Sequence, residues 1–481
     1  MVRTRIAPSP TGEYHIGHLR TCLYDYAWAK KNQGQFVIRI EDTDQKRYVP
    51  GAVERILQVI RDYGLSWDEG PDVGGKHGPY IQSQRQDIYK KHIEILLNKK
   101  NHQGNPCAYH CFCSQECLDK MRDQQKKQGQ VPRYDRRCLA LTSQEVEAKL
   151  KKGEPYVIRL RIPDNEVIEF SDLVRGQVKI DSRDLDDQVL IKSDGIPTYH
   201  FAVVVDDHLM EITHVFRGEE WIPSTPKQAL LYRYFDWPMP VFAHLTVLLD
   251  PSGKGKMGKR RGSVSARSFL DDGYLPEALL NFLMFLGWNP GDNREIFSLE
   301  EFVQAFNLEN LHKKAPVFDR NKLDYLNGYY IRQKTDQELA ELLKPFLPEL
   351  DEKSILFMVP LIKERIKTLS EAKELLEFIW QEPDYSKDLL LGKGLDQNLA
   401  REMLSGALEI IQRLGIDDTD KLQKEILALI ESRGWKTGQF FMVFRTAICG
   451  KPITPPILES LPLLGKKKVL DRLEIALKKL I

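Results

Sequence analysis

The stretch that decides the fold is Arg5-Ile6-Ala7-Pro8-Ser9-Pro10-Thr11-Gly12, which runs on into His15-Ile16-Gly17-His18. The sequence predicts a strand at 3–7, and the spacing over residues 17–32 predicts a helix. The Pro/Gly turn between them would lie outside the carboxyl end of a strand, where open α/β sheets bind their ligands. His15 and His18 then lie at a helix start, where free backbone N–H groups and the helix dipole favour phosphate. The stretch therefore predicts a site for a nucleotide.

The first hundred residues continue this alternation, with a strand expected at 36–40 and a helix at 52–63. That order is typical of βαβ units in a doubly wound parallel sheet. A polar, cysteine-rich segment at 101–152 interrupts it, and strand patterns follow at 156–162, 167–172 and 188–192. We expect the parallel sheet to resume at Val203-Val204-Val205 and to end near residues 245–249.

Beyond Lys256 the pattern is almost entirely helical, which predicts one or two all-α domains. The expected helices cover residues 276–286, 299–306, 319–330, 336–347 and 355–369, and others follow to the end of the chain. We place a domain boundary near Asp324.

Composition sets broad limits on function. The chain has 481 residues, of which 42% are hydrophobic, so it can bury several cores. Lys and Arg total 70 against 69 Asp and Glu, so a nucleic-acid partner would require positive charge gathered on one face. Apolar runs are too short to span a membrane, and the start of the chain reads as a strand instead of a signal peptide. We therefore expect a cytoplasmic protein.

A second motif, Lys256-Met257-Gly258-Lys259-Arg260, lies far downstream of the first. Together, in this order, the two motifs resemble the ATP signature of class I aminoacyl-tRNA synthetases. The stretch Arg5 to Gly12 and the turn Ile40-Glu41-Asp42-Thr43-Asp44 narrow the resemblance to bacterial glutamyl-tRNA synthetases, over essentially the whole chain.

The resemblance implies ATP-dependent ligation of L-glutamate to the 3′ end of tRNA(Glu) through a glutamyl-adenylate, with Mg²⁺ accompanying ATP. It implies an α/β fold in which a Rossmann-like catalytic sheet (1–100 and 196–255) is split by an inserted acceptor-binding α/β domain (101–195). A helical stem-contact domain (256–324) and a helical anticodon-binding domain (325–481) would follow. We expect a monomer.

The resemblance also assigns the nucleotide site. Its positions are His15, Gly17, His18, Lys256, Met257, Lys259 and Arg260, of which His15, His18, Lys256 and Lys259 are expected to act in catalysis. One residue departs from the family pattern: Gly258 stands where a serine is usual. Because Lys259 is retained, we expect the chemistry to survive, although the added backbone freedom would alter loop closure.

A glutamate pocket needs cationic donors for the side-chain carboxylate and an anion for the ammonium group. The positions that match the family's amino-acid site are Arg5, Ala7, Ser9, Glu41, Tyr199 and Arg217. By this resemblance Arg5 and Arg217 hold the γ-carboxylate, and Glu41 faces the ammonium. The alternatives are that Glu41 and Asp42 cap the next helix, that Arg217 pairs with Glu219 or Glu220, and that Asp206 and Asp207 are purely structural.

Five of the seven cysteines lie between Cys107 and Cys138, which argues against a disulfide scaffold. Cys111, Cys113 and Cys138 in a polar insert suggest a structural Zn²⁺ site. Tyr134 would be a fourth ligand by resemblance to a shorter glutamyl-transferring relative, and Cys117 is an alternative. A metal-free insert with reduced thiols is the competing interpretation.

The helical C-terminal region is expected to read the anticodon, because single-stranded bases can be stacked and hydrogen-bonded there. Arg365 and Lys367 lie in a stretch that resembles the family's anticodon-loop region. Three other functions stay open. They are a non-discriminating enzyme that also charges tRNA(Gln), glutamyl transfer to a modified tRNA base, and a degenerate synthetase that only binds tRNA.

Overall fold

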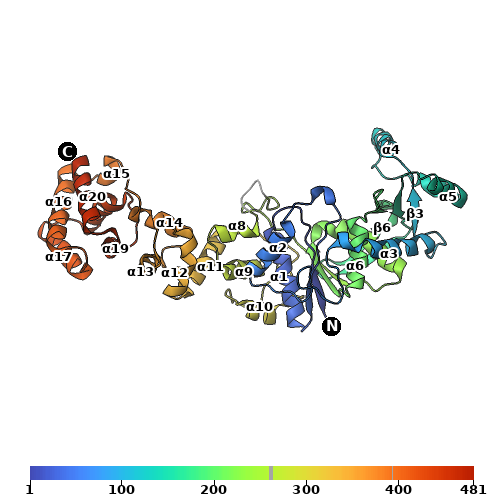
Figure 1. The fold of residues 1–481 in the computed structure, drawn as a ribbon, viewed down its shortest axis with the longest axis horizontal. Helices are drawn as coiled ribbons and strands as arrows, with labels where there is room; N and C mark the ends of the chain where they lie inside the picture. Colours follow the sequence, from blue (N-terminus) through green and yellow to red (C-terminus); the bar gives the residue numbers. More distant parts are fainter. Residues whose placement is uncertain (259–263, 393) are drawn as a thin grey trace. The chain divides into compact units, whose positions relative to one another are not determined.

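The computed structural model describes residues 1–258, 264–392 and 394–481, and it separates into two compact units (Figure 1). The first unit contains Met1–Ser268 and Leu279–Arg320, and the second contains Phe269–Ala278 and Asn321–Ile481. Lys259 and Arg260, two of the predicted nucleotide-site residues, lie outside the described residues. No helix in the described parts of the chain is long and apolar enough to cross a membrane.

The first unit begins with the predicted βαβ unit. Strand β1 (Arg3–Ile6) runs parallel to β2 (Gln35–Ile38), and α1 (Ile16–Lys31) connects them. A second helix, α2 (Ala52–Asp62), and then α3 (Gln86–Asn98) follow. The backbone N–H of Thr213 donates to the carbonyl of Arg3 at 2.9 Å, so the later half of the sheet continues beside β1. The prediction of a Rossmann-like α/β fold is thus confirmed.

The expected strand at Val203-Val204-Val205 is wrong, because these residues lie inside helix α6 (Tyr199–Leu209). The valines are all buried, and a short apolar run gives no periodicity that separates a buried helix from a buried strand. The sheet resumes instead at β8 (His214–Gly218), which runs parallel to β9 (Val241–Leu245). Helix α7 (Thr225–Phe235) connects this pair of strands.

The segment between the two halves of the sheet forms two small β structures. Strands β3 (Ala108–Cys111), β4 (Val157–Leu160) and β7 (Val189–Ile191) form an antiparallel sheet. Strands β5 (Val167–Asp172) and β6 (Gly176–Asp181) form a hairpin, and Asp172 joins β5 to β9 in parallel. Helices α4 (Gln115–Lys127) and α5 (Ser143–Lys151) lie between β3 and β4 in the chain. All three strands that the sequence predicted here are present.

After α8 (Ala266–Asp271), α9 (Pro276–Met284) and α10 (Leu299–Ala305), the described chain is helical to its end. The second unit contains α11 (Arg320–Gln333), α12 (Asp336–Leu343), α13 (Glu352–Ile362), α14 (Glu371–Leu376), α15 (Lys387–Leu391), α16 (Gln397–Leu414), α17 (Thr419–Ser432), α18 (Thr437–Cys449), α19 (Ile457–Leu464) and α20 (Lys466–Lys479). One apolar core runs through these helices.

The helix expected at 355–369 ends early, at Ile362. Local turn bonds continue as far as Ile366, whose amide donates to the carbonyl of Ile362 at 3.1 Å, and tertiary hydrogen bonds follow. The amide of Leu369 donates to the carbonyl of Gly273 at 3.0 Å, and Asn327 Nδ2 donates to the carbonyl of Lys367 at 2.5 Å. Arg365 and Lys367 consequently lie on a connection between α13 and α14, where both side chains are exposed.

Candidate active site

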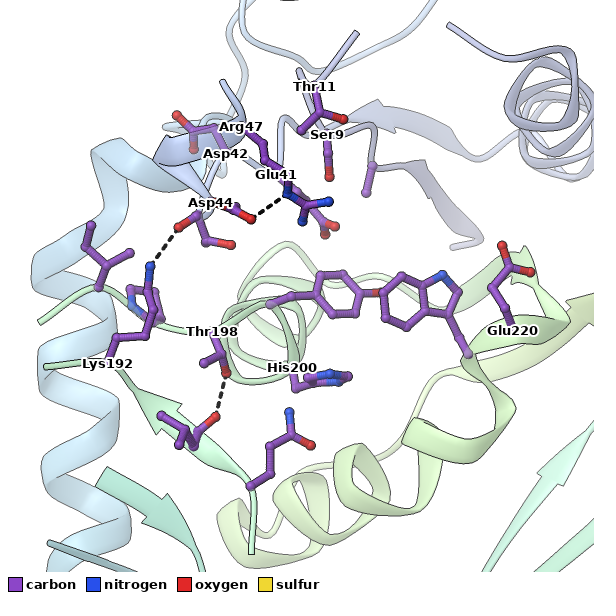
Figure 2. Close-up of a pocket in the computed structure, with 18 of the residues that line it drawn as sticks. Ser9, Thr11, Glu41, Asp42, Asp44, Arg47, Lys192, Thr198, His200 and Glu220 are labelled. Atoms are coloured by element: carbon purple, nitrogen blue, oxygen red, sulfur yellow. Dashed lines mark hydrogen bonds and ion pairs between the residues drawn. The ribbon is translucent and has the colours of Figure 1, made fainter. Parts of the chain in front are cut away.

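A cavity of about 1540 Å³ opens in the first unit at the carboxyl ends of β1 and β8. Residues from both halves of the sheet and from the insert line it, and Figure 2 shows Ser9, Glu41, His200 and Glu220 facing the same space. Eleven of the predicted site residues line this one cavity: Arg5, Ala7, Ser9, His15, Gly17, His18, Glu41, Tyr199, Arg217, Lys256 and Met257. Positions that are up to 252 residues apart in the chain therefore share one site.

His15 shapes one end of the cavity as the N-cap of α1. Its Nδ1 accepts from the backbone N–H of Gly17 at 2.9 Å. A side chain at Gly17 would place its Cβ 3.2 Å from His15 Nδ1, so glycine keeps this turn tight. His18 is exposed one turn along the helix, and desolvation at the cavity wall lowers its pKa, with Glu220 opposing and Lys256 adding to that effect.

Backbone pairing holds the two sequence motifs together. The amide of Ile16 donates to the carbonyl of Val264 at 2.9 Å, and the amide of Ala266 donates to the carbonyl of Tyr14 at 2.8 Å. On the other side of the second motif, the amide of Met257 donates to the carbonyl of Leu248 at 2.8 Å. Both ends of the segment that carries Lys259 and Arg260 are thus anchored at this cavity.

The base of the cavity is a network of buried charges. Asp207 accepts from Arg39 Nη1 at 2.7 Å and from Arg5 Nε at 3.2 Å, and Arg39 Nη2 donates to Glu41 at 3.0 Å. Asp206 accepts from Arg85 Nε at 2.7 Å. Burial alone would raise the pKa of Asp207, but Arg5 and Arg39 outweigh it and lower that pKa. The structural interpretation of Asp206 and Asp207 is therefore the one that their contacts support.

Glu41 and Asp42 have different roles. Glu41 Oε1 is held by Arg39, and Oε2 makes no hydrogen bond to any described residue. Asp42 instead accepts from the backbone amide of Ser83 at 2.8 Å and from Gln45 Nε2 at 3.3 Å. Neither residue caps the next helix, since the N-caps of Gln45–Arg47 and of α2 are Asp44 and Gly51; Asp42 binds the backbone far along the chain, and Glu41 is a cavity residue that an arginine positions.

Arg217, unlike Arg5, Arg39 and Arg85, pairs with no carboxylate among the described residues. Its Nε donates to His244 Nε2 at 3.0 Å, and its Nη2 donates to Thr225 Oγ1 at 2.7 Å. Only 6% of the residue is exposed, and burial lowers the pKa of its guanidinium. The predicted alternative of a pair with Glu219 or Glu220 is absent, since Glu219 pairs with Arg175 and Glu220 with Lys256. Arg217 is a desolvated cation that lines a cavity.

Tyr199 and residues that the sequence did not single out complete the wall. The ring of Tyr199 lies 4.4 Å from that of Trp221, centroid to centroid, and burial raises the pKa of its hydroxyl. His200 lines the same cavity, where burial lowers its pKa to about 4, and Lys192 and Lys227 add positive charge. Trp221 directly follows Glu219-Glu220 and lies four residues after Arg217. Its closeness in sequence to this predicted site residue could have identified it as part of the cavity wall.

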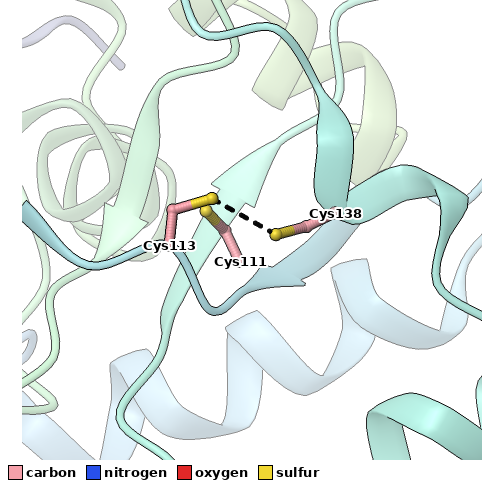
Figure 3. A group of neighbouring side chains, drawn as sticks. All are labelled: Cys111, Cys113 and Cys138. Atoms are coloured by element: carbon pink, nitrogen blue, oxygen red, sulfur yellow. Dashed lines mark hydrogen bonds between the residues drawn. The ribbon is translucent and has the colours of Figure 1, made fainter. Parts of the chain in front are cut away.

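The predicted metal ligands also meet in space. The sulfurs of Cys111, Cys113 and Cys138 lie within 4.8 Å of one another, and Figure 3 shows them turned toward a common point. The hydroxyl of Tyr134 lies 3.2 Å from Cys111 Sγ and 3.6 Å from Cys113 Sγ. Cys117 is not in this group, because its sulfur accepts from Arg137 Nη1 at 2.9 Å.

Comparisons with known proteins agree along the whole chain. Residues 1–325 match the family described as tRNA synthetases class I (E and Q), catalytic domain, and residues 338–477 match an anticodon binding domain. The glutamate–tRNA ligase of Alkaliphilus metalliredigens is 41% identical over 100% of this chain and 99% of its own length, and that of Finegoldia magna is 42% identical over 99% of each. A crystal structure of a glutamate tRNA ligase from Elizabethkingia meningosepticum in complex with its amino acid superposes with a TM-score of 0.87, at 35% identity and 100% coverage of both chains.

Proposed function

Because the chain belongs to the glutamate–tRNA ligases of class I, we propose that its cavity binds glutamate against Arg217 and Glu41 and binds ATP at the His15 and His18 end. The reaction is the ATP-dependent charging of tRNA with glutamate. The α-carboxylate of glutamate attacks the α-phosphorus of ATP, pyrophosphate leaves, and a terminal hydroxyl of tRNA then displaces AMP from the glutamyl-adenylate. Such chemistry depends on positioning and on charge stabilisation more than on covalent help from side chains.

The observation that supports the glutamate site best is the buried Arg217 without a carboxylate partner. A guanidinium in this state attracts a carboxylate strongly, because the surrounding protein screens the charges poorly. Arg5 lies nearby, but Asp207 already compensates its charge. Arg217 is therefore assigned the γ-carboxylate, and Arg5 supports it from the network behind the pocket.

The other end of glutamate has matching groups. Glu41 Oε1 is occupied by Arg39, so Oε2 is the atom proposed to accept from the substrate ammonium. Tyr199 and Ser9 line the space between the two ends and are proposed to orient the chain of the substrate. Glutamine would bring a neutral amide to Arg217 and leave that cation uncompensated, so the site selects glutamate.

For ATP, the proposed contacts are the start of α1 and the second motif. Free amides and the helix dipole at the start of α1 favour phosphate, and His15, His18 and Lys256 add donors there. The family pattern adds three more proposed ATP contacts, which are Met257, Lys259 and Arg260. Magnesium, which class I synthetases use with ATP, neutralises phosphate charge when bound; Glu220 at this end of the cavity is the carboxylate proposed to help hold it.

Replacing Arg217 by Ala tests the glutamate site. We expect the KM for glutamate to rise about 30-fold or more, since truncating one partner of a buried charge pair costs about 2 to 5 kcal/mol. The KM for ATP should stay nearly constant. Steady-state charging assays at varied glutamate and varied ATP measure both, with Arg233→Ala as the control because Arg233 is partly exposed and paired with Glu166 outside the cavity. An unchanged KM for glutamate would remove Arg217 from the pocket.

Gly258→Ser tests the departure from the family pattern. Among the described residues a Cβ at this position would meet nothing closer than the carbonyl of Lys256 at 3.9 Å, and the backbone is not in the left-handed region. The serine should therefore fit without strain, and we expect the rate of adenylate formation to stay within about threefold of the parent, below 1 kcal/mol of barrier. Rapid-quench measurement of adenylate gives that rate. A tenfold loss would show that glycine is required by this enzyme's loop.

For tRNA selection we propose Arg365 and Lys367 as anticodon contacts. Both are exposed, and Arg365 forms no ion pair with a described residue, so its guanidinium is available to a splayed base. Transfer to a modified tRNA base is not favoured, because the relatives matched over their full length are glutamate–tRNA ligases and the chain matches an anticodon binding domain.

Arg365→Gln should change the ratio of charging between tRNA(Glu) and tRNA(Gln), because the bidentate guanidinium is replaced by an amide with fewer donors. We expect the parent to charge tRNA(Glu) and the variant to lose about tenfold or more of its preference, as for one base contact worth 1 to 3 kcal/mol. Transfer of radiolabelled glutamate to each purified tRNA measures the ratio. Arg433→Gln, an exposed arginine elsewhere in the second unit, is the control, and identical ratios for both variants would assign the reading to other residues.

We further propose one structural Zn²⁺ held by Cys111, Cys113, Cys138 and Tyr134. Zn–S bonds of about 2.3 Å place the sulfurs of a tetrahedral site about 3.8 Å apart, and Cys113 Sγ and Cys138 Sγ are 3.6 Å apart. This part of the insert has a small core of five buried residues: Tyr109, Cys111, Met121, Tyr134 and Cys138. A metal that adds folding energy suits such a segment.

Elemental analysis of the purified protein tests this site. We expect about one Zn²⁺ per chain, as for a structural site of this ligand set, and loss of the metal in Cys138→Ser. Cys117→Ser should keep it, because that sulfur lies with Arg137. Tyr134→Phe separates a ligand from a packing residue: the ring is kept and the oxygen is lost, so retained zinc at parental affinity would exclude the phenol as fourth ligand.

A further inference from the structure

His244 lies directly behind Arg217, on the neighbouring strand β9, and it is fully buried. It does not line the cavity, so it is out of reach of substrate. Its Nε2 lies 3.0 Å from Arg217 Nε, and its Nδ1 lies 2.7 Å from Asp172 Oδ2. A buried, titratable side chain thus connects an acid at the end of β5 to the arginine proposed to bind glutamate.

The end partners fix the direction of the hydrogen bonds that run from Arg217 through His244 to Asp172. Arginine can only donate, and an ionised aspartate can only accept. His244 must therefore be neutral, with its proton on Nδ1 donated to Asp172 and its Nε2 lone pair accepting from Arg217. Thr225 Oγ1 also lies 3.1 Å from His244 Nε2. Thr225 fits the same scheme, because its hydroxyl accepts from Arg217 Nη2 and can donate to the carbonyl of Trp221 at 2.9 Å or to the lone pair of His244 Nε2.

Asp172 is itself held firmly. Its Oδ1 accepts from the amides of Val174 at 2.9 Å and Arg175 at 2.8 Å, and its Oδ2 also accepts from the amide of His244 at 3.0 Å. Burial alone would raise its pKa, but the side chain of His244 and, after it, the backbone hydrogen bonds from Arg175 and His244 outweigh that effect and lower the pKa. Asp172 is therefore an ionised and immobile anchor at the back of the chain.

We propose that Asp172 and His244 are positioning residues that fix the orientation of Arg217 and so determine how well the enzyme binds glutamate and rejects glutamine. This inference rests on the proposed glutamate site. With Nε and one Nη2 hydrogen held from behind, the guanidinium plane is set, and its other N–H groups are presented to the cavity that Arg217 lines. A guanidinium in a fixed orientation presents its N–H donors in the geometry that a planar carboxylate accepts. A mobile guanidinium could reorient to bind the side-chain amide of glutamine as well.

Protonation of His244 would break this arrangement. A protonated imidazole has no lone pair for Arg217 Nε and places a second cation beside it. The charged groups packed around His244 are Asp172 and Arg175 near the end of β5 and Arg217 on β8, and Arg175 is paired in turn with Glu219. Burial lowers the pKa of His244, Asp172 opposes this effect and Arg217 adds to it, so the neutral form is kept at neutral pH and lost as the solution becomes acidic.

Two substitutions separate positioning from packing. In His244→Gln the amide oxygen can take the place of Nε2 and still accept from Arg217. In His244→Asn the shorter amide can still donate to Asp172, but it has no acceptor that reaches Arg217. We expect the KM for glutamate to rise about tenfold or more in the Asn variant, as for a lost hydrogen bond to a charged group, and to stay within about threefold in the Gln variant, with selectivity against glutamine falling in parallel with KM.

The pH profile gives a readout that a packing role would not move. In the parent enzyme the KM for glutamate should rise as the pH falls below the ordinary imidazole range, while the KM for ATP should not follow it; in His244→Gln the rise should be absent. Thermal unfolding of both variants controls for packing. His208→Asn and His208→Gln are the matched controls, because His208 stacks on Trp237 outside the cavity.

The outcomes are distinguishable. If Arg217→Ala leaves the KM for glutamate unchanged, the glutamate site itself is wrong. If Arg217→Ala raises it but the Asn and Gln variants of His244 behave alike, or the acid-side rise persists in His244→Gln, then the positioning inference is overturned and the glutamate site stands. The parental pH profile decides even where a variant does not fold, since a KM for glutamate that is flat into the acid range contradicts a titrating His244.

Discussion

The pairing of Arg39 with Asp207, two fully desolvated charges 2.7 Å apart, is the interaction on which the catalytic unit depends. Arg39 follows β2 and Asp207 lies on α6, so this pair joins elements separated by 168 residues and by the whole insert. Asp207 also forms an ion pair with Arg5 of β1, and Asp206 forms one with Arg85. Removing one partner from such a network leaves an uncompensated buried charge, which typically destabilises a protein by about 3 to 5 kcal/mol.

This network explains why the site has the charges it has. Within it, Arg5, Arg39 and Arg85 each have a carboxylate, and Glu41 has Arg39. Arg217, on the next strand, has only neutral acceptors, His244 and Thr225. Because Arg5, Arg39 and Arg85 are compensated within the protein, an external carboxylate is attracted to Arg217 more strongly than to them. The same architecture thus provides a rigid base and, at Arg217, a buried cation that pairs with no carboxylate among the described residues.

The sequence predicted the βαβ start and the insert strands from local pattern, and it predicted the eleven site residues that line the cavity through their match to the positions of a known family. It failed at Val203-Val204-Val205, where a buried helix and a buried strand have the same apolar run, and beyond Ile362, where the chain leaves the helix and Leu369 donates to Gly273. It also missed His244. Nothing in the local sequence marks a histidine whose two ring nitrogens meet residues 27 and 72 positions away.

Leaving Arg217 without a carboxylate has a thermodynamic consequence. A desolvated guanidinium with neutral partners costs folding free energy in the unliganded protein, and a bound γ-carboxylate relieves that cost. Binding and stability are therefore linked, since a ligand that binds only the native state stabilises it in proportion to the logarithm of its concentration over Kd. Glutamine would gain less from this relief, because its amide cannot neutralise the cation. Selectivity for glutamate then follows from the desolvation cost of the uncompensated guanidinium. Replacing Arg217 by an apolar residue would remove that cost and stabilise the protein, but it would also remove the selectivity.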